Sequence, residues 1–122
     1  MRNISFAHTT QQISARTKTV TRRTGWRFAN PGDLLQAIEK GQGLKKGEHV
    51  NKLCVVRLVT VRTEPLNYIL YYRDDGMWEL EREGFGVIFP HTPAQFVEFF
   101  CDVNPSCTPD TLVTRLEFEY VD

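Results

Sequence analysis

The sequence lacks any apolar run long enough to cross a membrane. None of its 122 residues belongs to a stretch that approaches bilayer length, and its start, MRNISFAHTT, has no apolar signal-peptide core. Cysteine is scarce: Cys54, Cys101 and Cys107 include no CxxC pair and cannot close as a set of disulfides. We therefore expect a cytoplasmic protein without a membrane partner, in which Cys54 and Cys101 are small core residues.

The motifs of several common chemistries are missing as well. The histidines His8, His49 and His91 lack the paired spacing of a zinc-binding helix, and no acidic cluster resembles a calcium loop. Neither a GxSxG sequence nor a Walker loop occurs, and the glycines of residues 41–47 (GQGLKKG) are typical of a surface turn. We expect no metal and no organic cofactor.

The charges that are present cancel overall but are unevenly distributed. Fifteen basic and fifteen acidic side chains give zero net charge. Residues 1–62 hold twelve basic and three acidic side chains, about +9, and residues 63–122 hold three and twelve, about −9. If the halves stay apart in space, one face suits phosphate groups; if they interleave, the surface averages out. The length and the 41% apolar content fit one domain over residues 1–122.

Short-range patterns predict an α+β protein without a βαβ repeat. Strands are expected at 3–7, 53–62 and 113–121, helices at 10–16, 30–41 and from 92 onward, a short helix or bend at 66–70 and a turn at 74–76, whereas 77–82 is ambiguous. Asn30 with Pro31 is a typical helix start, and Thr92 to Gln95 forms a capping box. In the last strand, Leu116, Phe118 and Tyr120 should face the core and Arg115, Glu117 and Glu119 should face water.

Three features could carry chemistry. In KTVTRR, Lys18 precedes Thr21 by three residues, and the cations Arg22 and Arg23 favour a neutral lysine amine that can accept a proton. A solvated basic turn explains the same segment. Trp26 lies beside basic residues and could stack on a base, or it could be a core residue. Glu83, directly before a glycine, is a candidate acid, or one solvated carboxylate among Asp75, Glu79 and Glu81.

Taken in order, these segments resemble an ASCH domain across residues 3–121. The residues that carry the resemblance are KTVTRR, the EGF at 83–85, the strand VVRLVTVRTEPL, the helix FVEFFC and the closing TRLEFEYVD. ASCH domains are similar to PUA domains, which implies a small β-barrel flanked by short helices, with a cleft for RNA or a nucleobase. Residues 31–48 are longer than in short members of the family, and this difference bears on what enters the cleft.

Some small ASCH proteins are amidohydrolases that remove the acyl group from N4-acetylcytidine, without a metal. The resemblance implies Lys18 as the base, Thr21 as the nucleophile and Glu83 as the residue that holds Lys18 or passes a proton. Expected substrate-binding residues are Arg22, Arg23, Trp26 and Phe85. The expected partner is a modified cytidine nucleoside or RNA.

Two other functions remain open. In a non-catalytic RNA-binding module, Lys18, Arg22, Arg23 and Arg27 would contact phosphates and Trp26 would stack on an unpaired base. In an interaction domain, the acidic face would contact a protein partner. Fold alone cannot choose between them.

Overall fold

The computed structural model describes residues 1–41 and 43–122 of the chain. Its strands are β1 (Arg2–Ser5), β2 (Val20–Arg23), β3 (Leu34–Ile38), β4 (Lys52–Pro65) and β5 (Leu112–Tyr120). Its helices are α1 (Thr10–Ser14), α2 (Met77–Arg82) and α3 (Pro93–Val103), with two 3-10 helices, η1 (Leu66–Tyr71) and η2 (Arg73–Gly76). Within the described ranges, no helix has both the length and the apolar character that crossing a membrane requires.

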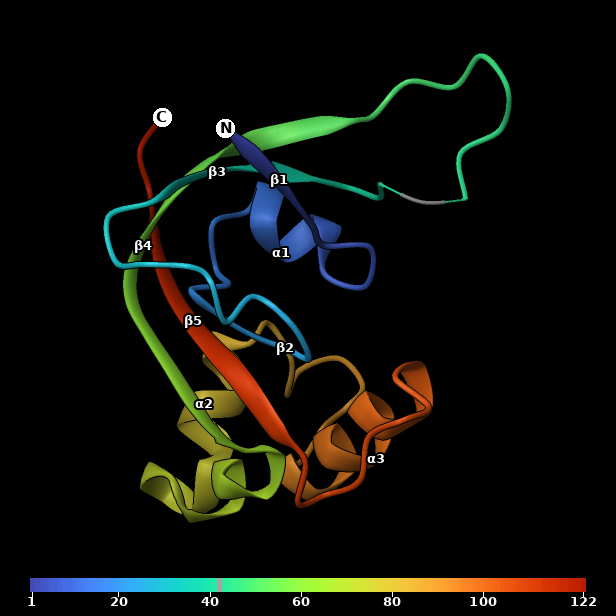
Figure 1. The fold of residues 1–122 in the computed structure, drawn as a ribbon. Coiled ribbons are helices and arrows are strands. Elements are labelled where there is room, and N and C mark those ends of the chain that lie inside the picture. Colours follow the sequence, from blue (N-terminus) through green and yellow to red (C-terminus); the bar gives the residue numbers. More distant parts are fainter. Residues whose placement is uncertain (42) are drawn as a thin grey trace.

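One mixed sheet runs through the whole molecule. Its strands lie in the order β1-β3-β4-β5-β2; β1 is parallel to β3 and the other neighbours are antiparallel. The long strands β4 and β5 curve side by side, with α1 near one end and α2 and α3 near the other (Figure 1). Register shifts after Ala37 and after Leu58 add bend, as β-bulges do. The expected α+β class is confirmed, with a curled half-barrel sheet.

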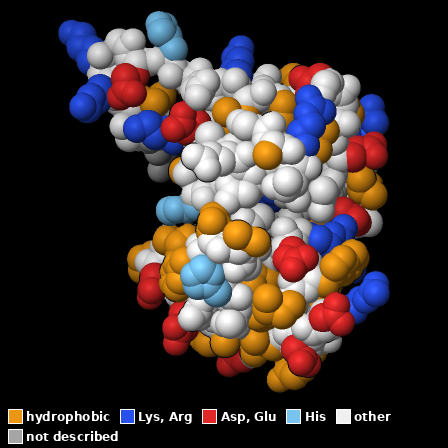
Figure 2. All heavy atoms as spheres, turned by 180° about the vertical axis from the view of Figure 1, so that it is seen from behind, with side chains coloured by type: hydrophobic (Ala, Val, Ile, Leu, Met, Phe, Trp, Pro, Cys, Tyr) orange, Lys and Arg blue, Asp and Glu red, His pale blue; other side chains and the backbone are white. Residues whose placement is uncertain are grey.

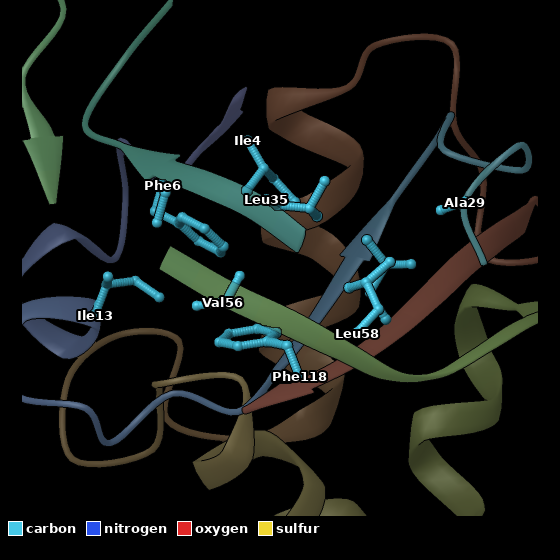
Figure 3. Close-up of a cluster of buried hydrophobic side chains, with 10 residues drawn as sticks. Ile4, Phe6, Ile13, Ala29, Leu35, Val56, Leu58 and Phe118 are labelled. Carbon is cyan, nitrogen blue, oxygen red and sulfur yellow. The ribbon is translucent and has the colours of Figure 1, made fainter. Parts of the chain in front are cut away.

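Two hydrophobic clusters hold the elements together. The first packs α1 against the sheet and contains Ile4, Phe6, Ile13, Ala29, Leu35, Ala37, Val56, Leu58, Leu116 and Phe118 (Figure 3). The second packs η1, α2 and α3 together and contains Leu66, Ile69, Leu80, Phe85, Phe96, Val97, Phe100, Cys107 and Val113. Both clusters take residues from β5, so this strand links the two ends of the molecule.

The helix expected over residues 30–41 is wrong, because this segment forms a turn and then the strand β3. Asp33 accepts a hydrogen bond from the amide of Asn30 and donates its own amide to the Asn30 carbonyl, which closes a turn. Gly32 has a φ of +92°, a conformation that ends helical geometry. Leu35 and Ala37 are buried between β1 and β4, so the apolar spacing serves a strand with two neighbours.

Most other expected elements are confirmed within a few residues. The expected strands at 3–7, 53–62 and 113–121 correspond to β1, β4 and β5, and the expected helix from 92 is α3. Thr92 caps α3 by accepting the Gln95 amide at 3.1 Å. The ambiguous segment at 77–82 is the helix α2. Gln42, in the turn expected at 41–47, lies outside the described residues.

The oppositely charged halves of the sequence interleave. Arg22 of β2 is paired with Glu64 of β4 and Glu79 of α2, and β2 itself pairs with β5. Arg115, expected on the wet face of β5, is instead buried against Glu79. The basic first half and the acidic second half of the sequence therefore do not form two separate faces. A projecting arm between β3 and β4 does carry exposed lysines, Lys40, Lys45 and Lys46, and shows blue side chains at its tip in Figure 2.

The cysteines differ from expectation in which of them is buried. Cys107 is buried in the second hydrophobic cluster, whereas Cys54 and Cys101 are only partly buried and pack at the edges of the two clusters. Successive side chains along β4 point to opposite faces of the sheet. A place in an apolar run therefore does not by itself put Cys54 in the core.

Candidate functional site

A pocket of about 820 Å³ brings together all seven residues selected from the sequence. They are Lys18, Thr21, Arg22, Arg23, Trp26, Glu83 and Phe85. Its remaining lining comes from the segment after β1, the loop after β2 and the helix α3. In Figure 2 the molecule is hollowed between its upper and lower parts, with hydrophobic side chains gathered below the hollow over α3 and the segment before it. The sheet and the helical end thus each supply one side of the site.

Lys18 is a buried amine at the floor of this pocket. Its side chain is 3% exposed, and its Nζ donates to the Oε1 of Glu83 at 3.1 Å and to the Glu83 main-chain carbonyl. The ring centroids of Phe85 and Phe6 lie 5.5 and 6.0 Å from Nζ. Burial lowers the pKa of Lys18 to about 8; Glu83 raises it, and Arg23 and Arg22 lower it. Glu83 and the two arginines act on the pKa of Lys18 in opposite directions, and burial has the largest effect.

Glu83 bridges two cations at the end of α2. Its Oε2 accepts from Arg22 Nη1 at 2.9 Å while its Oε1 accepts from Lys18, so both carboxylate oxygens are engaged. The chain then turns sharply at Gly84, where φ is +95° and a Cβ would lie 3.2 Å from Gln12. Gln12 donates to the Gly84 carbonyl at 3.1 Å and fixes this turn. The EGF motif therefore serves to direct Glu83 and Phe85 into the pocket.

Arg22 connects the pocket to a buried network of charges. Its Nη2 donates to Glu79 at 2.7 Å and to Glu64 at 3.2 Å, and Arg115 Nε donates to Glu79 at 2.6 Å. Burial opposes the charged form, but Glu83, Glu79 and Glu64 together raise the pKa of Arg22, so the guanidinium stays charged. Its Nε has no partner among the described residues. Arg22 is thereby fixed in position, and it in turn orients Glu83.

Glu79 is the charged residue behind the pocket that the sequence interpretation misjudged. The sequence favours a solvated acid at this position. The side chain of Glu79 is instead fully buried and contacts Arg22, Arg115 and Arg82. Arg115 and Arg22 lower the pKa of Glu79 although burial acts the other way. The signal was available: Glu79 and Glu83 lie four residues apart, so a helix at 77–82 puts them on one face. Of the neighbouring acids, Glu81 and Asp75 are exposed.

Thr21 is buried on β2 and is held by its neighbour two residues on. The Nε of Arg23 donates to Thr21 Oγ1 at 3.0 Å, and Arg23 Nη2 donates to the Ser5 carbonyl at 2.6 Å. Because side chains two apart lie on the same face of a strand, this contact follows from the TRR sequence itself. Within the described ranges, the hydrogen bonds of Lys18 Nζ go to Glu83 and not to Thr21. The contact between Lys18 and Thr21 that the resemblance implies is therefore not formed as a direct hydrogen bond here.

Aromatic side chains complete the walls of the pocket. Trp26 has a φ of +70° and is partly buried, with its ring 5.2 Å from that of Phe28. A further wall was not anticipated from the sequence and comes from α3: Phe96, Phe99, Phe100 and Val103. These residues are three or four apart and so share one face of α3, and Phe96 and Phe100 also belong to the second hydrophobic cluster. Among the described residues, no three His, Cys, Asp or Glu side chains are placed to hold one metal ion.

No protein-family model and no curated protein matches the sequence. Among solved structures, the fold is similar to protein EF3133 from Enterococcus faecalis, of the family DUF984, with a TM-score of 0.64 at 16% identity over 100% of this chain and 77% of that one. It is also similar to an ASCH domain from Lactobacillus crispatus, with a TM-score of 0.50 at 11% identity over 98% and 78% of the two chains. At such identities the likeness concerns the fold alone. The architecture expected from KTVTRR and EGF is thereby confirmed: this chain has an α+β fold similar to that of an ASCH domain.

Proposed function

We propose that this protein is a metal-independent amidohydrolase that removes the acyl group from N4-acylated cytosine nucleosides such as N4-acetylcytidine. The observation that carries the proposal is a buried lysine, Lys18, whose pKa is about 8, in the same pocket as Thr21 and Glu83. A lysine with so low a pKa is partly neutral near pH 7 and can accept a proton, which an ordinary surface lysine does not do.

The reaction follows from the roles of these three side chains. Thr21 Oγ attacks the acyl carbon while the neutral Lys18 amine takes the hydroxyl proton, in the manner of Ser-Lys hydrolases. The bond from the acyl carbon to N4 then breaks, and Lys18 returns the proton to N4, which releases cytidine. Water, activated by the same amine, hydrolyses the threonine ester to the free carboxylic acid. Glu83 is the positioning residue, because both of its oxygens already accept from cations.

Arg23 would stabilise the charge that develops in the transition state. Its Nε lies 3.0 Å from Thr21 Oγ1, so it is close to the place where the tetrahedral oxyanion forms. The same contact favours the deprotonated form of the threonine oxygen. Trp26 offers a ring on which the cytosine base can stack, and Phe85 packs beside the Lys18 amine.

The pairing of Lys18 and Arg22 with carboxylates supports an uncharged substrate group. Glu83 compensates Lys18, and Glu64, Glu79 and Glu83 compensate Arg22. Both cations are nearly inaccessible to solvent, which opposes the phosphate contacts expected of them in an RNA-binding module. An amide on a nucleobase needs no such free cations.

Binding of RNA remains the second candidate because exposed cations occur elsewhere. Arg27 lies beside Trp26, and Lys40, Lys45 and Lys46 project on the arm between β3 and β4. If these residues contact phosphates, affinity for single-stranded RNA falls with salt by a log-log slope of roughly −3, since each contact releases counterions. A flat salt dependence removes this candidate.

The direct test is incubation of the purified protein with N4-acetylcytidine. Turnover to cytidine is followed by the change in ultraviolet absorbance, with Lys18→Ala as the matched control. Hydrolysis by the wild type alone supports the proposal. No release of cytidine by the wild type contradicts it.

A further inference from the structure

The pocket has two groups of aromatic residues, and they differ in polarity. Trp26 and Phe28, in the loop after β2, adjoin the polar side chains of Arg23 and Thr24. Phe85, Phe99 and Val103, at the helical end, form an apolar wall. The first group can therefore meet a ring with polar edges, whereas the second suits a group without hydrogen-bonding atoms.

The apolar wall starts at the reactive amine and continues to the surface. Phe85 lies 5.5 Å from Lys18 Nζ, and the Phe85 and Phe99 rings are 5.7 Å apart in an edge-to-face arrangement. Phe99 in turn contacts His8, with centroids 5.3 Å apart, and the exposed ring of Phe89, at 6.1 Å. Figure 2 shows the hydrophobic side chains of this part of the molecule bordering the hollow.

This wall is larger than an acetyl group requires. A single methyl group is smaller than the apolar surface that Phe85, Phe99 and Val103 form together. The pocket volume of about 820 Å³ lies in the upper part of the range for sites that enclose drug-sized ligands. A nucleoside stacked on Trp26 therefore leaves room at the helical end for a further ring.

We propose, on the basis of the function proposed above, that the preferred substrates carry an aromatic acyl group on N4. The cytosine base lies on Trp26, where Arg23 and Thr24 meet its polar edges, and the acyl ring packs on the pocket side of Phe99 and Val103, beside Phe85. Aromatic rings gain from such edge-to-face contacts beyond the burial of their area. The reaction is the same hydrolysis: the bond from the acyl carbon to N4 breaks, water supplies the hydroxyl to carbon and the hydrogen to N4, and cytidine and an aromatic carboxylic acid leave.

The test compares N4-benzoylcytidine with N4-acetylcytidine on the wild type and on two matched variants. We expect the wild-type kcat/KM for the benzoyl substrate to exceed that for the acetyl substrate by about tenfold, the scale of an added apolar group in a fitting pocket. Phe99→Ala should lower this ratio by about threefold to tenfold. Trp26→Ala should lower kcat/KM for both substrates by the same factor, since it removes the contact with their shared base. Phe99→Leu keeps an apolar side chain on α3 and tests the ring if Phe99→Ala does not fold.

The possible outcomes separate this inference from the proposed function. Faster turnover of the acetyl substrate by the wild type overturns the inference and leaves the amidohydrolase intact. A benzoyl-to-acetyl ratio of kcat/KM that falls in Trp26→Ala and not in the Phe99 variants also overturns it. The acyl ring would then lie against Trp26 and not against Phe99. If neither amide is hydrolysed, the proposed function and the inference fall together.

Discussion

Glu83 accepts two hydrogen bonds from the amine of Lys18, one at its carboxylate and one at its own main-chain carbonyl. The carbonyl contact does not depend on the side chain, so substitution of Glu83 changes the charge beside the lysine more than its position. Variants at Glu83 therefore report on electrostatics, whereas variants at Lys18 and Thr21 report on the reacting groups themselves.

Lys18→Ala and Thr21→Ala should each abolish turnover of N4-acetylcytidine while the fold is kept. Because the two side chains act as one unit, the double variant should be little worse than either single one. Steady-state kcat/KM with circular dichroism of each variant checks this. Lys18→Arg should also be inactive, since a guanidinium does not lose its proton. Additive losses, or an active Lys18→Arg protein, contradict the role of the lysine as base.

The wild-type rate should rise with pH to a plateau above about 8. The base must be neutral, and burial lowers the pKa of Lys18 to about 8, so the active fraction increases tenfold per pH unit below that value. The measurement is kcat/KM between pH 5 and 10 in buffers of constant ionic strength. An acidic limb near the ordinary lysine pKa of 10.5, or no limb at all, would mean that Lys18 is not the base.

Glu83→Gln should move the acidic limb of kcat/KM to lower pH and lower its plateau by about tenfold, because a less basic Lys18 is a weaker proton acceptor. The carboxylate raises the pKa of Lys18 against burial, so its removal lowers that pKa further. Glu81→Gln is the control: Glu81 is exposed, lies two residues earlier, and its substitution makes the same change in net charge. We expect its activity to stay within about threefold of the wild type. Equal effects of the two substitutions would leave Glu83 without a special role.

Glu79→Gln should destabilise the protein by about 3 kcal/mol, because it leaves Arg22 and Arg115 buried without their shared carboxylate. Urea unfolding at pH 7 measures this, with Glu81→Gln expected within about 0.5 kcal/mol of the wild type. The pKa of folded Glu79 is lowered from 4.5, so its contribution is complete above pH 4.5 and is lost as pH falls through the folded value. The difference between wild type and variant should therefore shrink in acid. A difference that is constant with pH would assign the loss to packing.

Gly84→Ala should destabilise the protein and reduce activity together. Its φ of +95° strains any residue with a Cβ, and that atom would lie 3.2 Å from Gln12 and 3.5 Å from Lys18. We expect a loss of about 1–2 kcal/mol in thermal or urea unfolding. Gly25→Ala is the control for stability, since nothing lies within 4 Å of its Cβ position. Similar losses in the two variants would contradict a special requirement at the EGF turn.

The residues of the pocket were more predictable than the elements around them. The spacing in KTVTRR and the EGF segment identified the side chains that converge, because each was compared with a family pattern at a defined position. Residues 30–41 were assigned to a helix, since Asn30 and Pro31 start turns and helices alike, and only pairing with β1 and β4 decides for a strand. This strand pairing cannot be predicted from the local sequence.

Burial of charged residues was the other quantity that the sequence concealed. Glu79 and Arg115 each look like one solvated charge in an alternating or acidic stretch, and their burial depends on a partner from another segment. A helix at residues 77–82 would have put Glu79 on the same face as Glu83 and so indicated its burial. Because the sequence left this segment ambiguous, that indication was lost. A charge is kept in the interior when its partner is also there, which a reading of single segments cannot predict.

The buried charges have a consequence for how the protein becomes active. Lys18 and Glu83 are 65 residues apart, Arg22 and Glu64 are 42 apart, and Arg115 and Glu79 are 36 apart. Loop closure on this scale costs chain entropy before any contact compensates it, so such contacts belong to the slow, nonlocal part of folding. During refolding, turnover should therefore return with the final phase of chain assembly and lag behind the recovery of helical signal. No contiguous fragment that omits β2 or the end of α2 can contain a working pocket.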